Sequence, residues 1–144
     1  MEEEILNNLK TDFMGRNILY YNTIDSTHKE AKRIVNNDNI KNGTIIVANM
    51  QTDGIGTHNR KWYTKTGENI TFNIILYPNC NVEKIENITI VIAECIVQVV
   101  KQLYGLQLDI KYPNDVLYKG KKIAGILTRE YCFKRKSKEL NNRN

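Results

Sequence analysis

The chain has 144 residues, of which 41% are hydrophobic and 26% are charged, a balance typical of a soluble globular protein. This length is sufficient for one domain with a substantial core. No apolar run approaches the length of a membrane span, and the acidic start MEEEILNNLK differs from a signal peptide. We therefore expect a protein without a membrane segment.

The net charge of +5 invites comparison with nucleic-acid-binding proteins, but its distribution argues against that class. The excess is concentrated late in the chain, in Lys119–Lys122 and Lys134–Lys138. No basic–aromatic pattern repeats, and the first predicted helix is too short to be a winged-helix DNA-binding domain. An anionic small-molecule ligand explains the charge better than nucleic acid does.

Three cysteines are present, Cys80, Cys95 and Cys132. Their odd number and the lack of a CxxC or Cys/His spacing predict reduced thiols in the cytoplasm and no structural metal site. Cys95 falls on the apolar stripe of a predicted helix, so we expect it to contribute to packing.

The first fifty residues contain four segments with the periodicity of regular structure. They are a short amphipathic helix at Glu2–Phe13, a strand at Asn17–Asn22, a helix within Thr27–Asn37 and a β-branched strand at Thr44–Met50. Asp25, Ser26 or Thr27 caps the second helix. Capping alone explains these side chains; alternatively, hydroxyls at a helix N-terminus form one wall of a polar pocket.

The next segment, Gln51–Trp62 (QTDGIGTHNRKW), is a long polar connection between two strands. Connections of this length in a compact domain are usually functional or disordered. Its side chains suit anion binding and ring stacking, and Gly54 and Gly56 allow backbone N–H groups to approach a ligand. A mobile hairpin with incidental cations explains the same composition, because a G-x-G pair is a weak signal.

The remaining elements lie in the second half of the chain. They are a strand at Asn69–Tyr77, a helix at Val82–Tyr104 ended by Gly105, a strand at Gln107–Lys111, and a hairpin with arms Val116–Tyr118 and Lys122–Thr128 around the turn Lys119–Lys121. The run Ile123–Leu127 should be buried. Residues 129–144 read as a basic, solvated or frayed tail.

Two of these elements have a predicted apolar face. In the strand at Asn69–Tyr77 this face consists of Ile70, Phe72, Ile74 and Leu76. In the long helix the stripe consists of Ile85, Ile88, Ile92, Cys95, Ile96, Val99, Val100 and Leu103. We expect the helix stripe to cover one face of the sheet.

Three motifs, in this order, resemble the catalytic domain of the biotin–protein ligases. They are Ile24–Thr27 (IDST), the loop Gln51–Trp62, and Lys111–Leu127 (KYPNDVLYKGKKIAGIL). The family pattern combines a loop of the form Q-x-x-G-R-G-R-x-G-R-x-W with a K-W-P-N-D turn and a K-[LI]-[AS]-G-I-L strand. The resemblance implies an α+β fold with a mixed sheet and helices packed on one face, like a class II aminoacyl-tRNA synthetase core. It assigns residues 1–128 to a catalytic domain that is incomplete at its C-terminal side, followed by the tail.

The resemblance also implies a cytoplasmic, ATP-dependent, AMP-forming biotin–[acetyl-CoA-carboxylase] ligase. Such an enzyme uses Mg-ATP to convert biotin to biotinyl-5′-adenylate, and then transfers biotin to a lysine of a biotin carboxyl carrier domain. Since the reacting carboxylate and phosphate repel each other, the site must supply cations and N–H donors.

Candidate site residues follow from their match to the family motifs. Biotin would contact Ser26, Thr27, Gln51, Gly54, Gly56 and Lys122, and ATP would contact Arg60, Lys61, Trp62 and Asn114. Lys122 is the expected catalytic lysine, which reaches the biotin carboxylate and the α-phosphate. Asp115 is the second expected catalytic residue, as a Mg²⁺ ligand or as the group that orients the incoming amine. The structural alternatives are a solvated hairpin lysine for Lys122, a core position for Trp62, and turn formation for Asn114 and Asp115.

Two features depart from the family pattern. Ile55 and Thr57 stand where the loop usually carries arginines, and Asn59 replaces a glycine. Each lost charge-assisted contact weakens binding by about 1.5–3 kcal/mol unless His58 and backbone N–H groups compensate. The family's later G-x-G-x-N-type strand and helices have no counterpart after Leu127. A truncated, catalytically impaired biotin-binding module is therefore the alternative to an active ligase.

Overall fold

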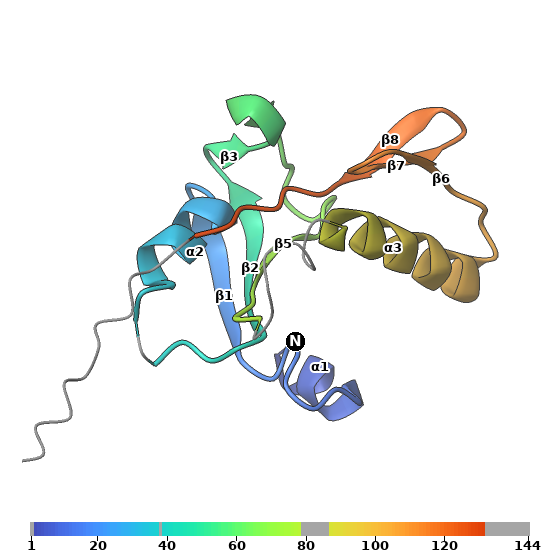
Figure 1. The fold of residues 1–144 in the computed structure, drawn as a ribbon. Coiled ribbons are helices and arrows are strands. Elements are labelled where there is room, and N and C mark those ends of the chain that lie inside the picture. Colours follow the sequence, from blue (N-terminus) through green and yellow to red (C-terminus); the bar gives the residue numbers. More distant parts are fainter. Residues whose placement is uncertain (1, 38, 79–86, 132–144) are drawn as a thin grey trace, which may run out of the picture.

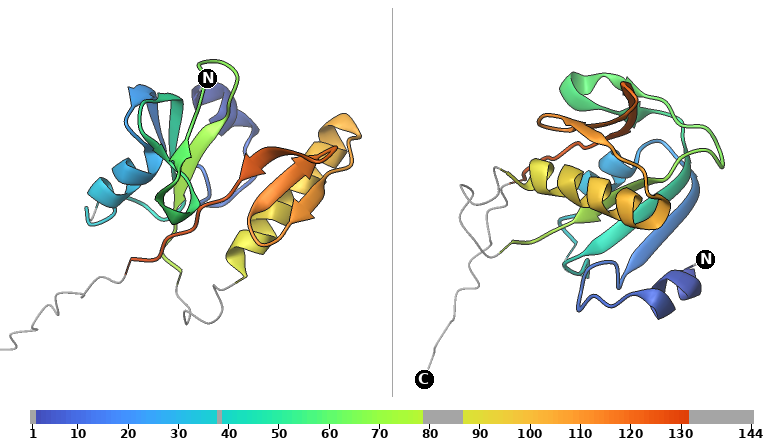
Figure 2. Two further views of the ribbon diagram at one scale, coloured as in Figure 1. Left: turned by 90° about the horizontal axis from the view of Figure 1, so that it is seen from above. Right: turned by 90° about the vertical axis from the view of Figure 1, so that its right-hand side faces the viewer.

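The computed structural model describes residues 2–37, 39–78 and 87–131. Its elements, in chain order, are α1 (Glu2–Asn8), β1 (Ile18–Ile24), α2 (Thr27–Ile34), β2 (Thr44–Gln51), β3 (Gly54–Ile55), η1 (Thr57–Asn59), β4 (Lys61–Trp62), β5 (Thr71–Ile75), α3 (Ile88–Tyr104), β6 (Asp109–Lys111), β7 (Asp115–Tyr118) and β8 (Lys121–Gly125). The larger strands form two groups, each with its own helix (Figure 1). In the view from above, the two groups lie side by side (Figure 2).

The first group is a mixed sheet of order β1-β2-β5, which we call the N-terminal sheet. β1 runs parallel to β2, and β5 runs antiparallel to it. The strand predicted at Thr44–Met50 is confirmed as β2, along which Thr44, Ile46 and Ala48 are buried at alternate positions. α2 packs on β2 and β5, and Ala31 joins Ile46 and Ile75 in the core.

The second group is an antiparallel sheet of order β6-β7-β8, the C-terminal sheet. α3 packs on β6 and β7, where Ala93, Leu108 and Val116 form a second small core. The predicted hairpin is confirmed, with Tyr118 paired to Lys121 across a two-residue turn. Both turn residues have positive φ, 49° at Lys119 and 76° at Gly120, as the right-handed twist of a tight hairpin requires.

Residues 54–62, which we call the flap, are more regular than predicted. β3 and β4 form an antiparallel ribbon, and the 3₁₀ turn η1 joins them. Figure 1 shows this ribbon above the N-terminal sheet. The α+β class and the mixed sheet are confirmed, although the described strands divide into three separate sheets.

Two helix boundaries follow from hydrogen bonds and backbone conformation at their ends. α1 stops at Asn8, earlier than predicted, and Phe13 lies outside it. The Arg16 guanidinium donates to the carbonyls of Leu6 and Leu9 at 3.4 and 3.0 Å, and so satisfies acceptors at the helix end. α3 ends at Gly105 in the left-handed conformation, as predicted. The earlier part of its predicted range, with Ile85, lies outside the described residues.

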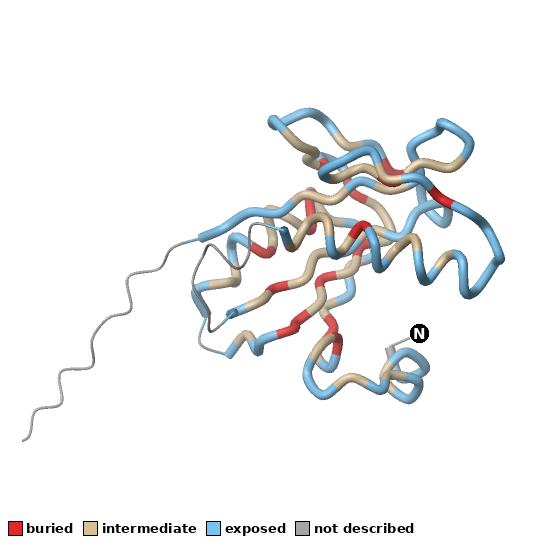
Figure 3. The backbone as a smooth tube through the Cα atoms, turned by 45° about the vertical axis from the view of Figure 1, so that its right-hand side comes forward, coloured by how far each residue is buried: buried red, intermediate tan, exposed pale blue. Residues whose placement is uncertain are grey.

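The predicted buried faces were partly wrong. On α3, Ala93 is fully buried, whereas Cys95 is exposed and Leu103 is 66% exposed. On β5 Ile75 is buried and Phe72 is 51% exposed, and Ile70, just before β5, is 89% exposed. Figure 3 shows how sparse the buried positions are. The physical reason is that each helix covers one small sheet, and periodicity does not show how much of a helix face that sheet reaches.

The run Ile123–Leu127 is also less buried than predicted, since Ile123 is 51% exposed and Gly125 is exposed. β8 is an edge strand of the C-terminal sheet, so only one of its sides has a strand partner among the described residues. None of the helices in the described part of the chain is long and apolar enough to cross a membrane.

Candidate functional site

Ser26, Thr27 and Gln51 form a buried polar cluster where the N-terminus of α2 meets the end of β2. Each is less than 8% exposed, and Thr64 lies beside them. The Ser26 hydroxyl accepts hydrogen bonds from the N–H groups of His28 and Lys29 at 3.2 and 3.4 Å. Ser26 is therefore the N-cap, and its capping role is confirmed.

The Gln51 side chain links the cluster to the flap. Its carbonyl oxygen accepts from the Thr27 N–H at 2.8 Å and from the Thr27 hydroxyl at 3.2 Å. Its backbone N–H donates to the Thr64 hydroxyl at 3.1 Å. With the carbonyl oxygen bound on the α2 side, the amide Nε2 faces Gly54 of the flap. A neutral ligand placed here would meet hydroxyl and amide groups and no charge.

Close packing explains Gly54, but not Gly56. A Cβ at Gly54 would lie 2.4 Å from the Trp62 carbonyl oxygen and 2.8 Å from Gln51 Nε2. At Gly56 the nearest atom, the Arg60 carbonyl oxygen, would be 3.5 Å away, an ordinary contact. Gly56 also has an extended backbone with φ −104°, which any residue adopts.

Ion pairs hold the start of α2 in place. Arg33 donates to both carboxylate oxygens of Asp25 at 2.7 and 3.0 Å, and Asp25 accepts the Ser26 N–H at 2.7 Å. The Arg33 hydrogen bonds lower the pKa of Asp25 to about 2. Lys29 pairs with Asp53, and this hydrogen bond lowers the pKa of Asp53, with a smaller contribution from the charge of Lys61.

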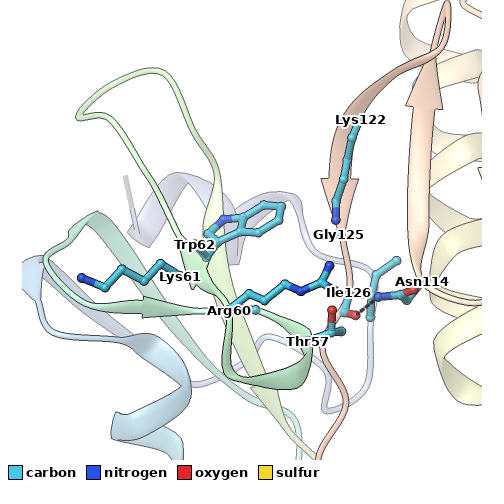
Figure 4. Close-up of a pocket in the computed structure, with 9 residues that line it drawn as sticks. Thr57, Arg60, Lys61, Trp62, Asn114, Lys122, Gly125 and Ile126 are labelled. Carbon is cyan, nitrogen blue, oxygen red and sulfur yellow. Dashed lines mark hydrogen bonds between the residues drawn. The ribbon is translucent and has the colours of Figure 1, made fainter.

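A cavity of about 180 Å³ lies between the flap and the C-terminal sheet. Its lining residues are Gly56, Thr57, Arg60, Lys61, Trp62, Asn114, Lys122, Gly125 and Ile126. Figure 4 shows the guanidinium of Arg60 and the ammonium of Lys122 directed into this space. The ammonium of Lys61 points away from these two groups. Among the residues labelled in Figure 4, Arg60 and Lys122 are therefore the cations directed into the cavity.

Lys122 and Asp115 meet across the hairpin. The Lys122 ammonium lies 2.7 Å from Asp115 Oδ1, and the side chains are 39% and 19% exposed. Asp115 Oδ1 is buried and accepts no hydrogen bond from the described residues. Among the described residues, this ion pair is the contact that the buried Oδ1 makes. Lys122 is thus a partly exposed hairpin lysine that is held in an ion pair.

Asn114 connects the turn before β7 to the end of β8. Its carbonyl accepts the Ile126 N–H at 2.8 Å, and its amide donates to the Ile126 carbonyl at 3.4 Å. A second cavity of about 270 Å³ adjoins the first and shares Thr57, Asn114 and Ile126 with it. Its other lining residues are His58, Thr89, Pro113, Leu127 and Thr128.

The segment after β8 returns from the C-terminal sheet to the flap and to α2 (Figure 1). Arg129 donates to the side-chain oxygen of Asn59 at 3.4 Å, and the Tyr131 hydroxyl lies 3.3 Å from His28 Nε2. Burial lowers the pKa of His28, and the charges of Arg129 and Lys32 lower it further.

The candidate residues therefore fall into two adjoining groups. The buried cluster contains Ser26, Thr27, Gln51 and Gly54, and the cavity contains Gly56, Arg60, Lys61, Trp62, Asn114 and Lys122, with Asp115 beside it. Sequence reasoning did not select Thr64, Gly125 or Ile126 as site residues. Gly125 and Ile126 lie in the I-A-G-I-L motif, which we used for the family resemblance and interpreted as a buried strand without assigning its residues to the site, so the motif itself was the available signal.

A sequence profile of the biotin/lipoate A/B protein ligase family matches residues 20–140. The chain belongs to this family. It is 40% identical over 127 residues to the bifunctional ligase/repressor BirA of Bacillus subtilis (strain 168), an alignment that covers 88% of this chain and 39% of the relative. The protein of the same name from Escherichia coli (strain K12) is 26% identical over 113 residues, which are 78% of this chain and 35% of that protein.

Solved structures of biotin protein ligases share the fold. The enzyme from Aquifex aeolicus in complex with biotin and ATP has a TM-score of 0.65 at 29% identity, over 78% of this chain and 46% of that chain. The biotin complex of the Leishmania major enzyme has a TM-score of 0.68 at 23% identity, over 77% and 50%, and supports the fold alone. The predicted resemblance to biotin–protein ligases is confirmed. The chain spans 39% of the length of the Bacillus subtilis relative and 35% of the length of the Escherichia coli relative.

Proposed function

We propose that this chain provides the biotin- and ATP-binding part of a biotin–protein ligase. The observation that carries the proposal is the position of Lys122. Its ammonium faces a cavity shared with Arg60, and the Trp62 strand connects that cavity to the buried amide and hydroxyl cluster around Gln51. The related Aquifex enzyme was solved with biotin and ATP, and both ligands suit this arrangement.

Biotin would bind with its uncharged ring system at the cluster and its carboxylate toward the flap. The ureido group is neutral, and Ser26, Thr27 and Gln51 offer neutral partners. The amide nitrogen of Gln51 faces Gly54, on the side from which the ligand would enter. The carboxylate would then lie between the cluster and Lys122.

ATP would bind at the two cavities. Arg60 and Lys122 are the cations available for its α-phosphate, and the Thr57 hydroxyl lines both cavities. The second cavity is lined by hydroxyl, amide and apolar groups and by His58, which suits the uncharged part of a nucleotide. Lys61 is a weaker candidate than predicted, because its ammonium points away from the other cations.

In the first step a biotin carboxylate oxygen attacks the α-phosphorus, and the bond to the pyrophosphate oxygen breaks. Lys122 would stabilise the negative charge that two approaching anions concentrate there, a contribution typically worth about 10²–10³ in rate for one well-placed donor. In the second step a carrier lysine amine attacks the acyl carbon, and AMP leaves. Asp115, the ion-pair partner of Lys122 beside the cavity, would orient this amine.

Mg²⁺ is expected with ATP, where it neutralises phosphate charge. The described residues contain no group of three or more His, Cys, Asp or Glu side chains suited to a metal ion. Asp115 alone fits as a protein ligand, which matches the way Mg²⁺ usually binds through one or two carboxylates and substrate phosphates. A cytoplasmic location is part of the same proposal, in keeping with an odd number of cysteines without metal or disulfide spacing.

Mass spectrometry of a biotin carboxyl carrier domain tests the proposal after incubation with the protein, biotin and Mg-ATP. We expect addition of one biotinyl group with the wild-type chain and with Lys121→Met, an exposed lysine on the same strand. Lys122→Met should abolish it. Equal modification by both variants would contradict the role of Lys122, whereas biotin binding in calorimetry without pyrophosphate release on adding ATP would identify an impaired binding module.

A further inference from the structure

The flap and the C-terminal sheet touch where Trp62 meets Gly125. A Cβ built on Gly125 would lie 3.0 Å from Trp62 Cη2 and 3.1 Å from Trp62 Cζ3. A side chain at position 125 would therefore press on the six-membered ring of the indole, which would have to move by a few tenths of an ångström. The same Cβ would lie 3.0 Å from Lys122 Cε, so three residues meet at this point.

The Lys122 ammonium lies between this aromatic ring and a carboxylate. It is 5.1 Å from the centroid of the Trp62 ring and 2.7 Å from Asp115 Oδ1. A cation within about 6 Å of a ring centroid over its face is attracted by the ring quadrupole. Lysine is otherwise a flexible four-carbon chain with a strongly hydrated charge, so contacts on two sides restrict where its ammonium can lie.

We propose that Trp62 and Gly125 are positioning residues for Lys122. The missing side chain at Gly125 allows the indole to rest on β8, and the indole then holds the ammonium beside Asp115 at the edge of the cavity. Since Trp62 belongs to β4, the position of the flap controls the position of the lysine. The effect on catalysis rests on the proposed function, whereas the contact between Trp62, Gly125 and Lys122 does not depend on that function.

Fluorescence tests the contact directly, because Trp62 is the single tryptophan of the chain. Removal of the ammonium in Lys122→Met should change the emission maximum or intensity of Trp62, and Lys121→Met should leave both unchanged. In Gly125→Ala the new methyl group displaces the indole, so quenching of its emission by iodide should increase. Identical emission from wild type and Lys122→Met would overturn the proposal, even if Gly125→Ala fails to fold.

Steady-state kinetics test whether the contact between Trp62 and Lys122 affects ligase turnover. Trp62→Phe retains an aromatic face for Lys122, so kcat should be roughly 2–30-fold lower in Trp62→Leu than in Trp62→Phe, the span of partly shielded to desolvated cation–π contacts. The KM for biotin should change little, because the head-group contacts lie at Gln51. Equal kcat values for the two variants would overturn the positioning role. If the wild-type chain is inactive, the proposed function fails, and the fluorescence comparison alone decides whether the contact exists.

Discussion

The two flap glycines provide the sharpest test of the packing between β2, β3 and β4. In Gly54→Ala the new Cβ would lie 2.4 Å from the Trp62 carbonyl oxygen. The backbones of β3 and β4 must therefore move apart until this distance reaches about 3.0 Å. Gly54 pairs directly with Trp62 in the ribbon, so a shift of this size disrupts the pairing. Overpacking of this kind destabilises by roughly 1–3 kcal/mol, a factor of about 5–150 in the unfolding equilibrium.

Gly56→Ala is the matched control for stability. Its Cβ would meet its nearest neighbour at 3.5 Å, and its extended backbone suits alanine. The stability should therefore change little, or rise by about 0.4–1 kcal/mol because the unfolded chain loses freedom. Urea unfolding followed by far-UV circular dichroism measures both variants. Equal free energies of unfolding for the two variants would refute the assignment of Gly54 as the closely packed glycine.

Three further predictions, at Ser26, Ile46 and His28, test other parts of the fold. Ser26→Ala should lower stability by about 0.5–2 kcal/mol in urea unfolding through loss of the α2 cap, whereas Ser26→Gly, which adds no bulk to this buried site, should cost only a few tenths of a kcal/mol; equal losses would argue against capping. Ile46→Ala should lower the free energy of unfolding by about 2–5 kcal/mol, whereas the same change at the exposed Ile70 should have little effect. Burial lowers the pKa of His28 in the folded protein. The contribution of His28 to the free energy of unfolding is therefore fully present above about pH 6.5, and it is lost as pH falls through the lower folded-state pKa. His28→Gln should therefore show a smaller decline of melting temperature below about pH 6.5 than wild type does, and parallel declines would contradict this reasoning.

Local sequence determined the features that depend on near neighbours. The hairpin turn at Lys119-Gly120, the glycine end of α3 and the cap at Ser26 each depend on the backbone preferences of a few consecutive residues. The β-branched run Thr44–Met50 likewise identified β2 as a strand. The family could be recognised from the same short segments, because motifs such as K-x-P-N-D are themselves local.

Tertiary structure decided which residues meet. Lys121 and Lys122 are indistinguishable by composition, and only the register of β7 against β8 directs the second toward Asp115. Gly54 and Gly56 appear alike in sequence, yet only Gly54 faces a carbonyl oxygen from the other strand of the ribbon. Cys95 and Ile123 looked buried and are exposed. Periodicity shows that an apolar face exists, but burial and charge pairing depend on segments distant in the sequence, whose positions no local pattern contains.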